Sequence, residues 1–279
     1  MSPGDGPRVA VVTGAARAGS IGRAIAARLL RDGLQVVISD LGGPLDTHPD
    51  YESAGASDLR DARDALGALG DVHALPCDVR RAGDVQALVD GAVERFGRFD
   101  VLVNNAGLGV GLTPVVELDE ADWRLNLDVM ATGVFLCSRA AARQMIEQGD
   151  GGRIVTIASQ AAKTGLPLLS AYCAAKFAAL GFTQSLAHEL GPHAITVNAV
   201  CPGTVDTPLL AVKGGVYERY SAMAGITEEQ YRKRVLRTIP LGRMATPDDI
   251  AQAVGFLVSP AAGYITGEAI NVTGGQEMH

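Results

Sequence analysis

Short runs of apolar, mostly β-branched residues alternate along this chain with longer segments of helical periodicity, and this alternation constrains the fold more than any other feature. The runs lie at residues 9–12, 36–38, 72–75, 101–103, 154–157, 195–200 and 269–272. Strands that alternate with helices build right-handed βαβ units, whose strands lie parallel in one sheet. The sequence therefore predicts an α/β protein with a doubly wound parallel sheet of about seven strands and helices on both faces.

Composition excludes several classes of protein. The 279 residues carry 24 Lys and Arg against 31 Asp and Glu, which gives a formal net charge of −7. Proteins that bind nucleic acids hold phosphates with clustered basic residues, so we expect no nucleic-acid partner. The sequence has no run of about 18 apolar residues, the length that spans a bilayer, and residues 1–7 lack the pattern of a signal peptide. We therefore expect no membrane association and a location in the cytoplasm.

The cysteines and histidines do not indicate a disulfide framework or a metal site. The four cysteines lie far apart and include no Cys-x-x-Cys pair, so we expect them to be small core residues. His188 and His193 have a spacing that does not place two ligands on one helix face. We predict that the protein binds no metal.

Two irregular stretches interrupt the alternation within a chain that has no linker and no internal repeat. Residues 41–57 are rich in Gly, Pro and Asp and are predicted to be a surface insertion. Residues 207–240 contain a short helix predicted to begin near Thr227, where Thr227 and Gln230 can form a capping box. Because long insertions in a compact α/β domain are more often lids or binding loops than idle connections, we expect residues 207–240 to form a substrate-binding loop and helix.

A glycine-rich turn at residues 13–22 follows the first strand. It precedes an Ala- and Leu-rich helix, the arrangement in which backbone N–H groups and a helix N-terminus approach a pyrophosphate. Asp40 ends the second strand about 20 residues after Gly19, where a carboxylate can accept hydrogen bonds from an adenosine ribose and would repel a 2′-phosphate. The sequence therefore favours NAD as the cofactor, although Arg17 in the turn favours NADP. A turn that binds nothing and a solvated surface carboxylate are the alternative interpretations.

Ser159, Tyr172 and Lys176 form a second candidate site. Ser159 ends an apolar strand, and Lys176 follows Tyr172 by four residues, so both share one face of a helix. A nearby ammonium lowers the pKa of a phenol from its reference value of about 10. Tyr172 is thus predicted to exchange a proton with an alcohol or carbonyl, while Ser159 hydrogen-bonds the same oxygen.

These features together resemble the short-chain dehydrogenase/reductase family, over residues 9–275. The residues that match the family are Thr13, Gly14, Asp78, Asn104, Asn105, Ala106, Gly107, Ser159, residues 172–176, Pro202, Gly203, Thr207, Pro208, residues 265–267, Gly274 and Gly275. The resemblance implies that residues 1–279 form one dinucleotide-binding catalytic domain with a Rossmann fold, in which Ser159, Tyr172 and Lys176 are catalytic. The cofactor-binding residues that it implies are Gly14, Arg17, Gly19, Ser20, Ile21, Asp40, Asp78, Val79, Asn105, Ala106, Gly107, Tyr172, Lys176, Pro202, Gly203, Val205 and Thr207.

The resemblance also implies a role for each region of the cleft. Asp78 and Val79 would hold the adenine, and Asn104 would line the cofactor cleft. Lys176 would also hydrogen-bond the nicotinamide ribose. The nicotinamide ring and its carboxamide would be framed by Pro202, Gly203, Val205 and Thr207. For each of them the alternative is a turn or core residue that contacts no ligand.

Two departures from the family pattern affect the expected mechanism. The glycine-rich turn is two residues longer than usual, and its Gly-x5-Ser arrangement at residues 14–20 resembles the divergent enoyl reductases. Those enzymes place six residues between their Tyr and Lys, whereas this chain has three. We therefore expect the protein to act on an alcohol or ketone rather than as an enoyl reductase. Met130 stands where the family usually has a catalytic Asn, and Asn126, one helical turn earlier, is a candidate substitute.

The expected substrate is a small neutral molecule. Gln160, Leu166, Leu168 and residues 209–223 are predicted to form mostly apolar pocket walls, which favour a neutral secondary alcohol or ketone of the diol, polyol or cyclic type. Within the family, the sequence looks most like acetoin/diacetyl reductases and polyol dehydrogenases. The insertion at residues 41–57 has the position of extra residues in carveol-dehydrogenase-like members that hold NAD tightly.

Resemblance further implies a homotetramer, formed through the outer faces of the predicted helices at residues 119–148 and 170–190. Two other functions stay open. One is a 3-oxoacyl reductase that uses NADPH, and the other is a dinucleotide-binding protein without turnover, for which Met130 and the lengthened turn are the reasons.

Overall fold

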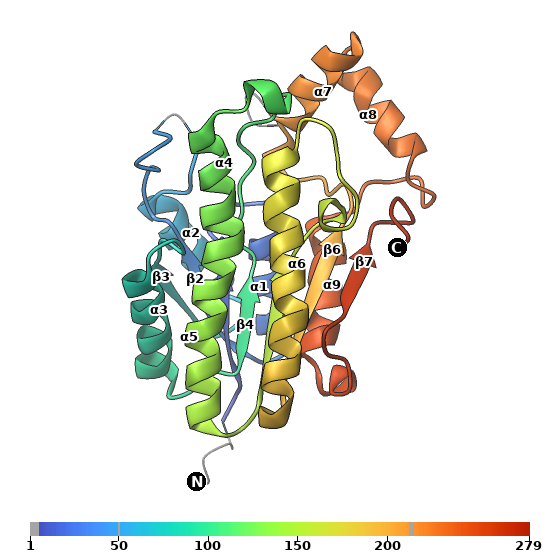
Figure 1. Cartoon of the computed structure of the whole chain (residues 1–279). Coiled ribbons are helices and arrows are strands. Elements are labelled where there is room, and N and C mark those ends of the chain that lie inside the picture. The colour runs from blue at the N-terminus through green and yellow to red at the C-terminus, as the bar shows by residue number, and fades with distance from the viewer. Residues whose placement is uncertain (1–5, 50, 212–214) are drawn as a thin grey trace.

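The centre of the structure, a computed structural model that describes residues 6–49, 51–211 and 215–279, is one parallel sheet (Figure 1). Within these residues the sheet has seven strands in the order β3-β2-β1-β4-β5-β6-β7. The strands are β1 (Val9–Thr13), β2 (Gln35–Asp40), β3 (Val72–Pro76), β4 (Val101–Asn104), β5 (Gly152–Ile157), β6 (Ile195–Pro202) and β7 (Ala269–Val272). Each predicted apolar run coincides with a strand, so the predicted sheet is confirmed.

Some predictions fall outside the described residues. The predicted domain 1–279 includes residues 1–5, the predicted insertion 41–57 includes residue 50, and the predicted substrate-binding segment 207–240 includes residues 212–214. The side chains of residues 209 and 211, in that same segment, are not described either.

Helices cover both faces of the sheet because alternate strand residues point to opposite faces. On β1, Val11 packs into one hydrophobic core, while Ala10 and Val12 pack into the other. Helices α3 (Ala82–Phe96), α4 (Glu120–Leu127), α5 (Gly133–Gln148) and α6 (Ser170–Leu190) contribute to the first core, and α1 (Ile21–Arg31), α2 (Ala56–Gly67) and α9 (Pro247–Val258) contribute to the second. Figure 1 shows α5 and α6 side by side in front of the sheet. The predicted doubly wound arrangement is confirmed.

The strand order reverses between β1 and β4. Strand β1 pairs with both β2 and β4, and the chain moves outward in opposite directions on the two sides. In open α/β sheets a crevice forms at this point, outside the carboxyl ends of the strands. The fold therefore places the residues that follow β1, β2, β4 and β5 around one crevice.

The helix predicted at residues 119–148 is interrupted. Helix α4 ends at Leu127, a π-helical turn covers Asp128–Thr132, and α5 begins at Gly133, whose N–H bonds to the Asp128 carbonyl. Such turns occur often at functional sites. Met130 lies in the turn.

The two irregular segments differ from each other. Residues 41–57 have little regular structure, as predicted, but Leu45 and Ala54 are buried, so the segment is more than a surface excursion. Residues 207–240 form α7 (Val216–Ala224) and α8 (Glu228–Arg237), which Figure 1 shows at one end of the molecule beyond the sheet. Thr227 caps α8 and forms the predicted capping box with Gln230.

The cysteines are small core residues, as predicted. All four, Cys77, Cys137, Cys173 and Cys201, are free and buried. In the described ranges, no helix is both long enough and apolar enough to cross a membrane.

Candidate active site

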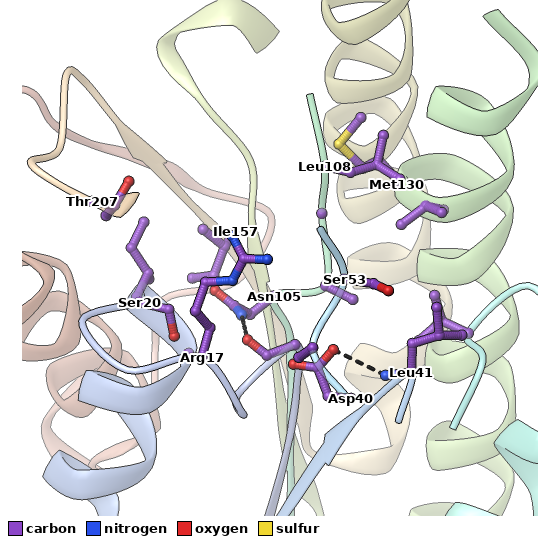
Figure 2. A pocket seen from close by; sticks show the side chains of 18 of the residues that line it. Arg17, Ser20, Asp40, Leu41, Ser53, Asn105, Leu108, Met130, Ile157 and Thr207 are labelled. Carbon is purple, nitrogen blue, oxygen red and sulfur yellow. Dashed lines mark hydrogen bonds between the residues drawn. The ribbon is translucent and has the colours of Figure 1, made fainter. Parts of the chain in front are cut away.

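A cleft runs along the carboxyl ends of the strands (Figure 2). Its lining takes residues from six strand ends: Gly14 after β1, Asp40 on β2, Asp78 after β3, Asn105 after β4, Ser159 after β5 and Pro202 on β6. Of the residues predicted to bind cofactor or to catalyse, the lining includes Gly14, Arg17, Ser20, Ile21, Asp40, Asp78, Val79, Asn105, Ala106, Gly107, Ser159, Tyr172, Lys176, Pro202, Gly203, Val205 and Thr207.

Gly19 and Asn104 do not line the cleft. Gly19 adopts a φ of +70° within the turn, a conformation that favours glycine, and its contact with the cofactor stays a prediction. The Asn104 side chain is buried and donates a hydrogen bond to the Ser138 hydroxyl at 2.8 Å. The prediction that Asn104 faces the cleft is therefore wrong, because its amide links β4 to α5.

The predicted pocket walls also need correction. Leu210 lines the cleft, but Gln160, Leu166 and Leu168 do not. These three residues are half-buried and belong to the segment that connects β5 to α6.

The glycine-rich turn is fixed by close backbone contacts. Gly14 has a φ of +68°, and a Cβ atom there would lie 2.7 Å from the Ala106 Cα atom, which leaves no room for a side chain. Asn105 donates from its amide to the carbonyls of Thr13 and Gly14 at 2.8 and 2.9 Å. Ser20 caps helix α1 by accepting a hydrogen bond from the Arg23 N–H at 3.2 Å. The N-terminus of α1 is thus held at the edge of the cleft, where its dipole favours an anion.

Asp40 lies at the end of the cleft formed by β1 and β2. One carboxylate oxygen accepts the Ala16 N–H at 3.0 Å and the other accepts the Leu41 N–H at 2.9 Å. Desolvation raises the pKa of this carboxyl above its usual value, even though both hydrogen bonds and the charge of Arg17 act to lower it. Each oxygen keeps a further acceptor position. Arg17 is not free beside it, since its guanidinium donates to the Glu52 carbonyl.

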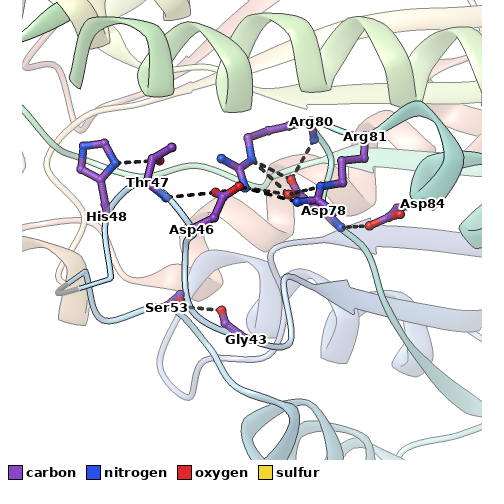
Figure 3. A network of polar contacts seen from close by, with 9 residues as sticks. All are labelled: Gly43, Asp46, Thr47, His48, Ser53, Asp78, Arg80, Arg81 and Asp84. Carbon is purple, nitrogen blue, oxygen red and sulfur yellow. Dashed lines mark hydrogen bonds and ion pairs between the residues drawn. The ribbon is translucent and has the colours of Figure 1, made fainter. Parts of the chain in front are cut away.

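Asp78 belongs to a charged network beside the cleft (Figure 3). Arg80 pairs with Asp78 at 2.7 Å and with Asp46 of the insertion at 3.0 Å. Desolvation raises the pKa of Asp78, but the hydrogen bonds from Arg80 outweigh it and hold the pKa below the usual value. Asp78 is therefore charged and oriented at neutral pH.

The insertion forms a cleft wall that the sequence did not predict. The lining residues from this segment are Leu41, Leu45, Tyr51, Glu52, Ser53 and Ala54. Tyr51 packs against the core, and the backbone of Gly109 hydrogen-bonds its phenol. Only the length of the insertion after Asp40 could have indicated this, because its residue types look like those of a solvated loop.

The three predicted catalytic residues meet at the other end of the cleft. Ser159 accepts the Ala161 N–H at 3.1 Å and hydrogen-bonds Tyr172 through its side chain. The Lys176 ammonium donates to the Ile157 carbonyl at 2.8 Å and lies 5.6 Å from the centroid of the Tyr172 ring. The structure therefore brings the hydroxyl, the phenol and the ammonium together.

Burial dominates the protonation of this group. It raises the pKa of Tyr172 above its usual value, although the hydrogen bond with Ser159 acts in the opposite direction. Burial also lowers the pKa of Lys176 to about 8. The pKa of Tyr172 is therefore shifted in the direction opposite to the lowering predicted from Lys176, because desolvation of the phenol is the largest cause of the shift.

Sequence comparison identifies the family. A family model described as enoyl-(acyl carrier protein) reductase matches residues 14–277. An L-2,3-butanediol dehydrogenase of Corynebacterium glutamicum is 36% identical over 274 residues, which cover 96% of this chain and 98% of that protein. The chain belongs to the short-chain dehydrogenase/reductase family.

Solved structures of the family share the architecture. A variant of actinorhodin polyketide ketoreductase with NADPH has a TM-score of 0.87 at 36% identity, and the match covers 98% of both chains. Carveol dehydrogenase from Mycobacterium avium in complex with NAD has a TM-score of 0.89 at 29% identity, again covering 98% of both chains. The predicted family and Rossmann-like fold are both confirmed.

This short-chain dehydrogenase/reductase departs from the family pattern at Met130, and Asn126 does not compensate. Met130 lines the cleft and is 1% exposed. Asn126 is fully buried and donates from its amide to the carbonyls of Val110 and Asp122 at 3.2 and 2.8 Å. The suggestion that Asn126 substitutes in the site is therefore wrong, since its amide is used to hold the loop after β4.

Proposed function

We propose that this protein is an NAD(H)-dependent oxidoreductase that transfers a hydride between the cofactor and a small neutral secondary alcohol or ketone. The observation that carries the proposal is the geometry of one cleft. The hydroxyl of Ser159, the phenol of Tyr172 and the ammonium of Lys176 meet at one end, and the carboxylate of Asp40 lies at the other. Residues 1–279 would form one catalytic domain around this cleft.

The residues present fit a dinucleotide. The N-terminus of α1, capped by Ser20, faces the middle of the cleft. A helix N-terminus stabilises a pyrophosphate at such a position. Asp40 retains acceptor positions for ribose hydroxyls, and Asp78 and Val79 line the neighbouring wall, where the adenine is proposed to bind. When bound, the nicotinamide supplies or accepts the hydride.

Each catalytic residue has a separate task in the proposed reaction. Tyr172 keeps its proton at neutral pH because its pKa is raised, so its phenol donates that proton to the oxygen of a ketone during reduction. In the oxidation direction Tyr172 must first lose its proton, and its phenolate then accepts the hydroxyl proton of the alcohol. Ser159 hydrogen-bonds the same oxygen and orients the carbonyl. Lys176 binds the nicotinamide ribose and places positive charge beside the phenol as the phenolate forms.

The choice of NAD rests on Asp40 and Arg17. A carboxylate at the adenosine ribose repels a 2′-phosphate. Arg17, the residue that favours NADP, is turned toward the Glu52 carbonyl of the insertion. The charge of Asp40 and the hydrogen bond that holds Arg17 on the insertion both support NAD as the cofactor.

The substrate end supports a neutral substrate. The cleft lining includes Leu108, Val129, Met130 and Leu210, none of which carries a charge, and the first three belong to the core against which Tyr172 packs. A small alcohol or ketone of the diol or cyclic type fits such walls. The similarity to a butanediol dehydrogenase and a carveol dehydrogenase agrees with this class.

The test combines binding with turnover. NADH fluorescence is titrated first, and then a panel of neutral secondary alcohols and ketones is assayed in both directions. Tyr172→Phe is expected to lower kcat by at least about 100-fold, because it removes the proton and keeps the ring. Tight NADH binding without turnover on any substrate, and no effect of Tyr172→Phe, would instead indicate a dinucleotide-binding protein.

A second candidate is a 3-oxoacyl reductase that uses NADPH. The 36% identity to a ketoreductase with NADPH favours it. Comparing the NAD to NADP ratio of kcat/KM in the wild type and in Asp40→Ala separates the two. We expect an NAD preference that falls at least about tenfold in Asp40→Ala, while the exposed control Asp64→Ala keeps it. A wild type that prefers NADP would favour the reductase.

Assembly and location remain predictions. We propose a homotetramer, which light scattering after gel filtration would test, and a location in the cytoplasm, which cell fractionation would test.

A further inference from the structure

The Lys176 ammonium lies in a largely dry environment. Lys176 is only 6% exposed. Its ammonium group carries three N–H donors. Within the described part of the chain, the Ile157 carbonyl is the acceptor that the ammonium bonds, at 2.8 Å, and no carboxylate forms an ion pair with it. Two donors therefore remain for other partners.

Met130 closes one side of this environment. A Cβ atom built on Gly107 would lie 3.5 Å from the Met130 sulfur and 3.8 Å from the Lys176 nitrogen, so both atoms flank the bare Cα of Gly107. The π-helical turn at Asp128–Thr132 places Met130 there, and Figure 2 shows its side chain among the residues that line the cleft. A thioether is a weak hydrogen-bond acceptor and an apolar packing group.

The neighbouring polar residue in the described part of the chain, Asn126, does not replace Met130 in this role. Asn126, one turn earlier, gives both hydrogens of its amide group to backbone carbonyls, and its side-chain oxygen is buried without a hydrogen-bond partner in the described residues. On the α4–α5 side, the group that the structure shows near the ammonium is therefore the thioether of Met130.

We propose that Met130 is a positioning residue which excludes water from the α4–α5 side of Lys176, so that the two free donors of the ammonium are directed into the cleft. The direction of those donors toward a ribose rests on the proposed function. The exclusion of water does not, because it concerns atoms of this chain alone.

The protonation of Lys176 should then depend on residue 130. Burial lowers the Lys176 pKa to about 8, and the titratable groups around it offer little compensation. The titratable neighbour on α6 is the phenol of Tyr172, and the one on β6 is the thiol of Cys201. Asp128 is exposed, and Arg153 lies near the start of β5, at the end of that strand away from the cleft. A polar group or water beside the ammonium stabilises its charged form and raises its pKa.

The test follows the four lysines of the protein by NMR, with the Cε atoms labelled with ¹³C. Lys176→Arg assigns the signal, and no cofactor or substrate is added. In the wild type we expect Lys176 to titrate near pH 8. Met130→Asn should raise its pKa by about one unit, and Met130→Leu, which keeps the site apolar, should leave it in place.

Met130→Gln provides a second polar variant in case the shorter side chain destabilises the fold. If Met130→Asn and Met130→Gln leave the titration unchanged, or if Met130→Leu moves it as far as they do, the proposal is wrong. In the assay with substrate, the basic limb of the kcat profile should shift to higher pH in the polar variants alone. A protein without turnover would overturn the proposed function and leave the NMR result standing.

Discussion

The two irregular segments that border the cleft are held in different ways. The insertion at residues 41–57 is tied to three elements around the cleft, namely the glycine-rich turn, the start of α3 and helix α4. The ties are Arg17 to the Glu52 carbonyl, Arg80 to Asp46 at 3.0 Å, and His48 to Asp122 at 2.8 Å. Its residues also line the cleft, so it is part of the wall.

Residues 207–240 instead pack, together with Met244 just beyond them, into a small core that is separate from the two main ones. Tyr217, Ile239 and Met244 form a separate hydrophobic cluster. The segment is joined to the loop before α6 by the Tyr220 hydroxyl, which donates to the Pro167 carbonyl. One segment that borders the cleft is therefore built into the main fold, and the other lines the cleft through Thr207, Pro208 and Leu210 while its helices pack into a separate cluster.

This difference predicts that the two ends can be altered separately. Changes in the insertion should act on cofactor affinity, and changes in residues 207–240 should act on the KM for substrate. A substitution that changed both constants equally would show that the two segments move together.

Among the changes that compare the two segments, the largest effect is expected from Tyr51→Ala. The Tyr51 ring packs against the core and lines the cleft, so its removal takes apolar surface from the wall of the nucleotide end. NADH fluorescence titration should show a Kd raised about tenfold, with little change in the KM for substrate. Tyr51→Phe keeps the ring and loses only the hydrogen bond with Gly109, so it should stay within about threefold of the wild type. Equal effects of the two variants would contradict a wall that acts by burial.

A smaller effect, at the opposite end, is expected from Tyr220→Phe. The change removes the hydrogen bond to Pro167 but keeps the stacking of this ring on Tyr231, whose centroids are 5.6 Å apart. The KM for substrate should rise about three- to tenfold, the cost of one hydrogen bond, while the NADH Kd stays unchanged. Tyr264→Phe is the matched control, because that side chain is fully exposed. A weaker affinity for NADH in Tyr220→Phe would contradict the separation of the two ends.

The sequence was sufficient for the framework of the cleft. The apolar runs defined all seven strands, and the positions of Gly14, Asp40 and Ser159 directly after or on strands placed them at the same edge of the sheet. These features are local, because a single short stretch of sequence predicts both where a strand ends and which residues follow it.

The rest depends on contacts between distant segments. Nothing in the sequence around Asn104 shows that its amide bonds Ser138, and nothing around Arg17 shows that it meets Glu52. The raised pKa of Tyr172 was missed for the same reason. The spacing to Lys176 is visible in the sequence, but the burial that outweighs it is set by the packing of the whole cleft.

The smallest effect is expected from His48→Asn. The His48 ring lies 2.8 Å from the Asp122 carboxylate, but both side chains are partly exposed, and such pairs contribute about 0–1 kcal/mol. Cofactor Kd and kcat should both stay within about fivefold of the wild type, and Asp122→Asn should give the same result. A double-mutant cycle of the two would measure their coupling. A tenfold loss of affinity in His48→Asn would show that the insertion closes the cleft through this ionic contact. A small change, beside the larger one in Tyr51→Ala, would show that the nucleotide end is held by the burial of one ring more than by the charges around it.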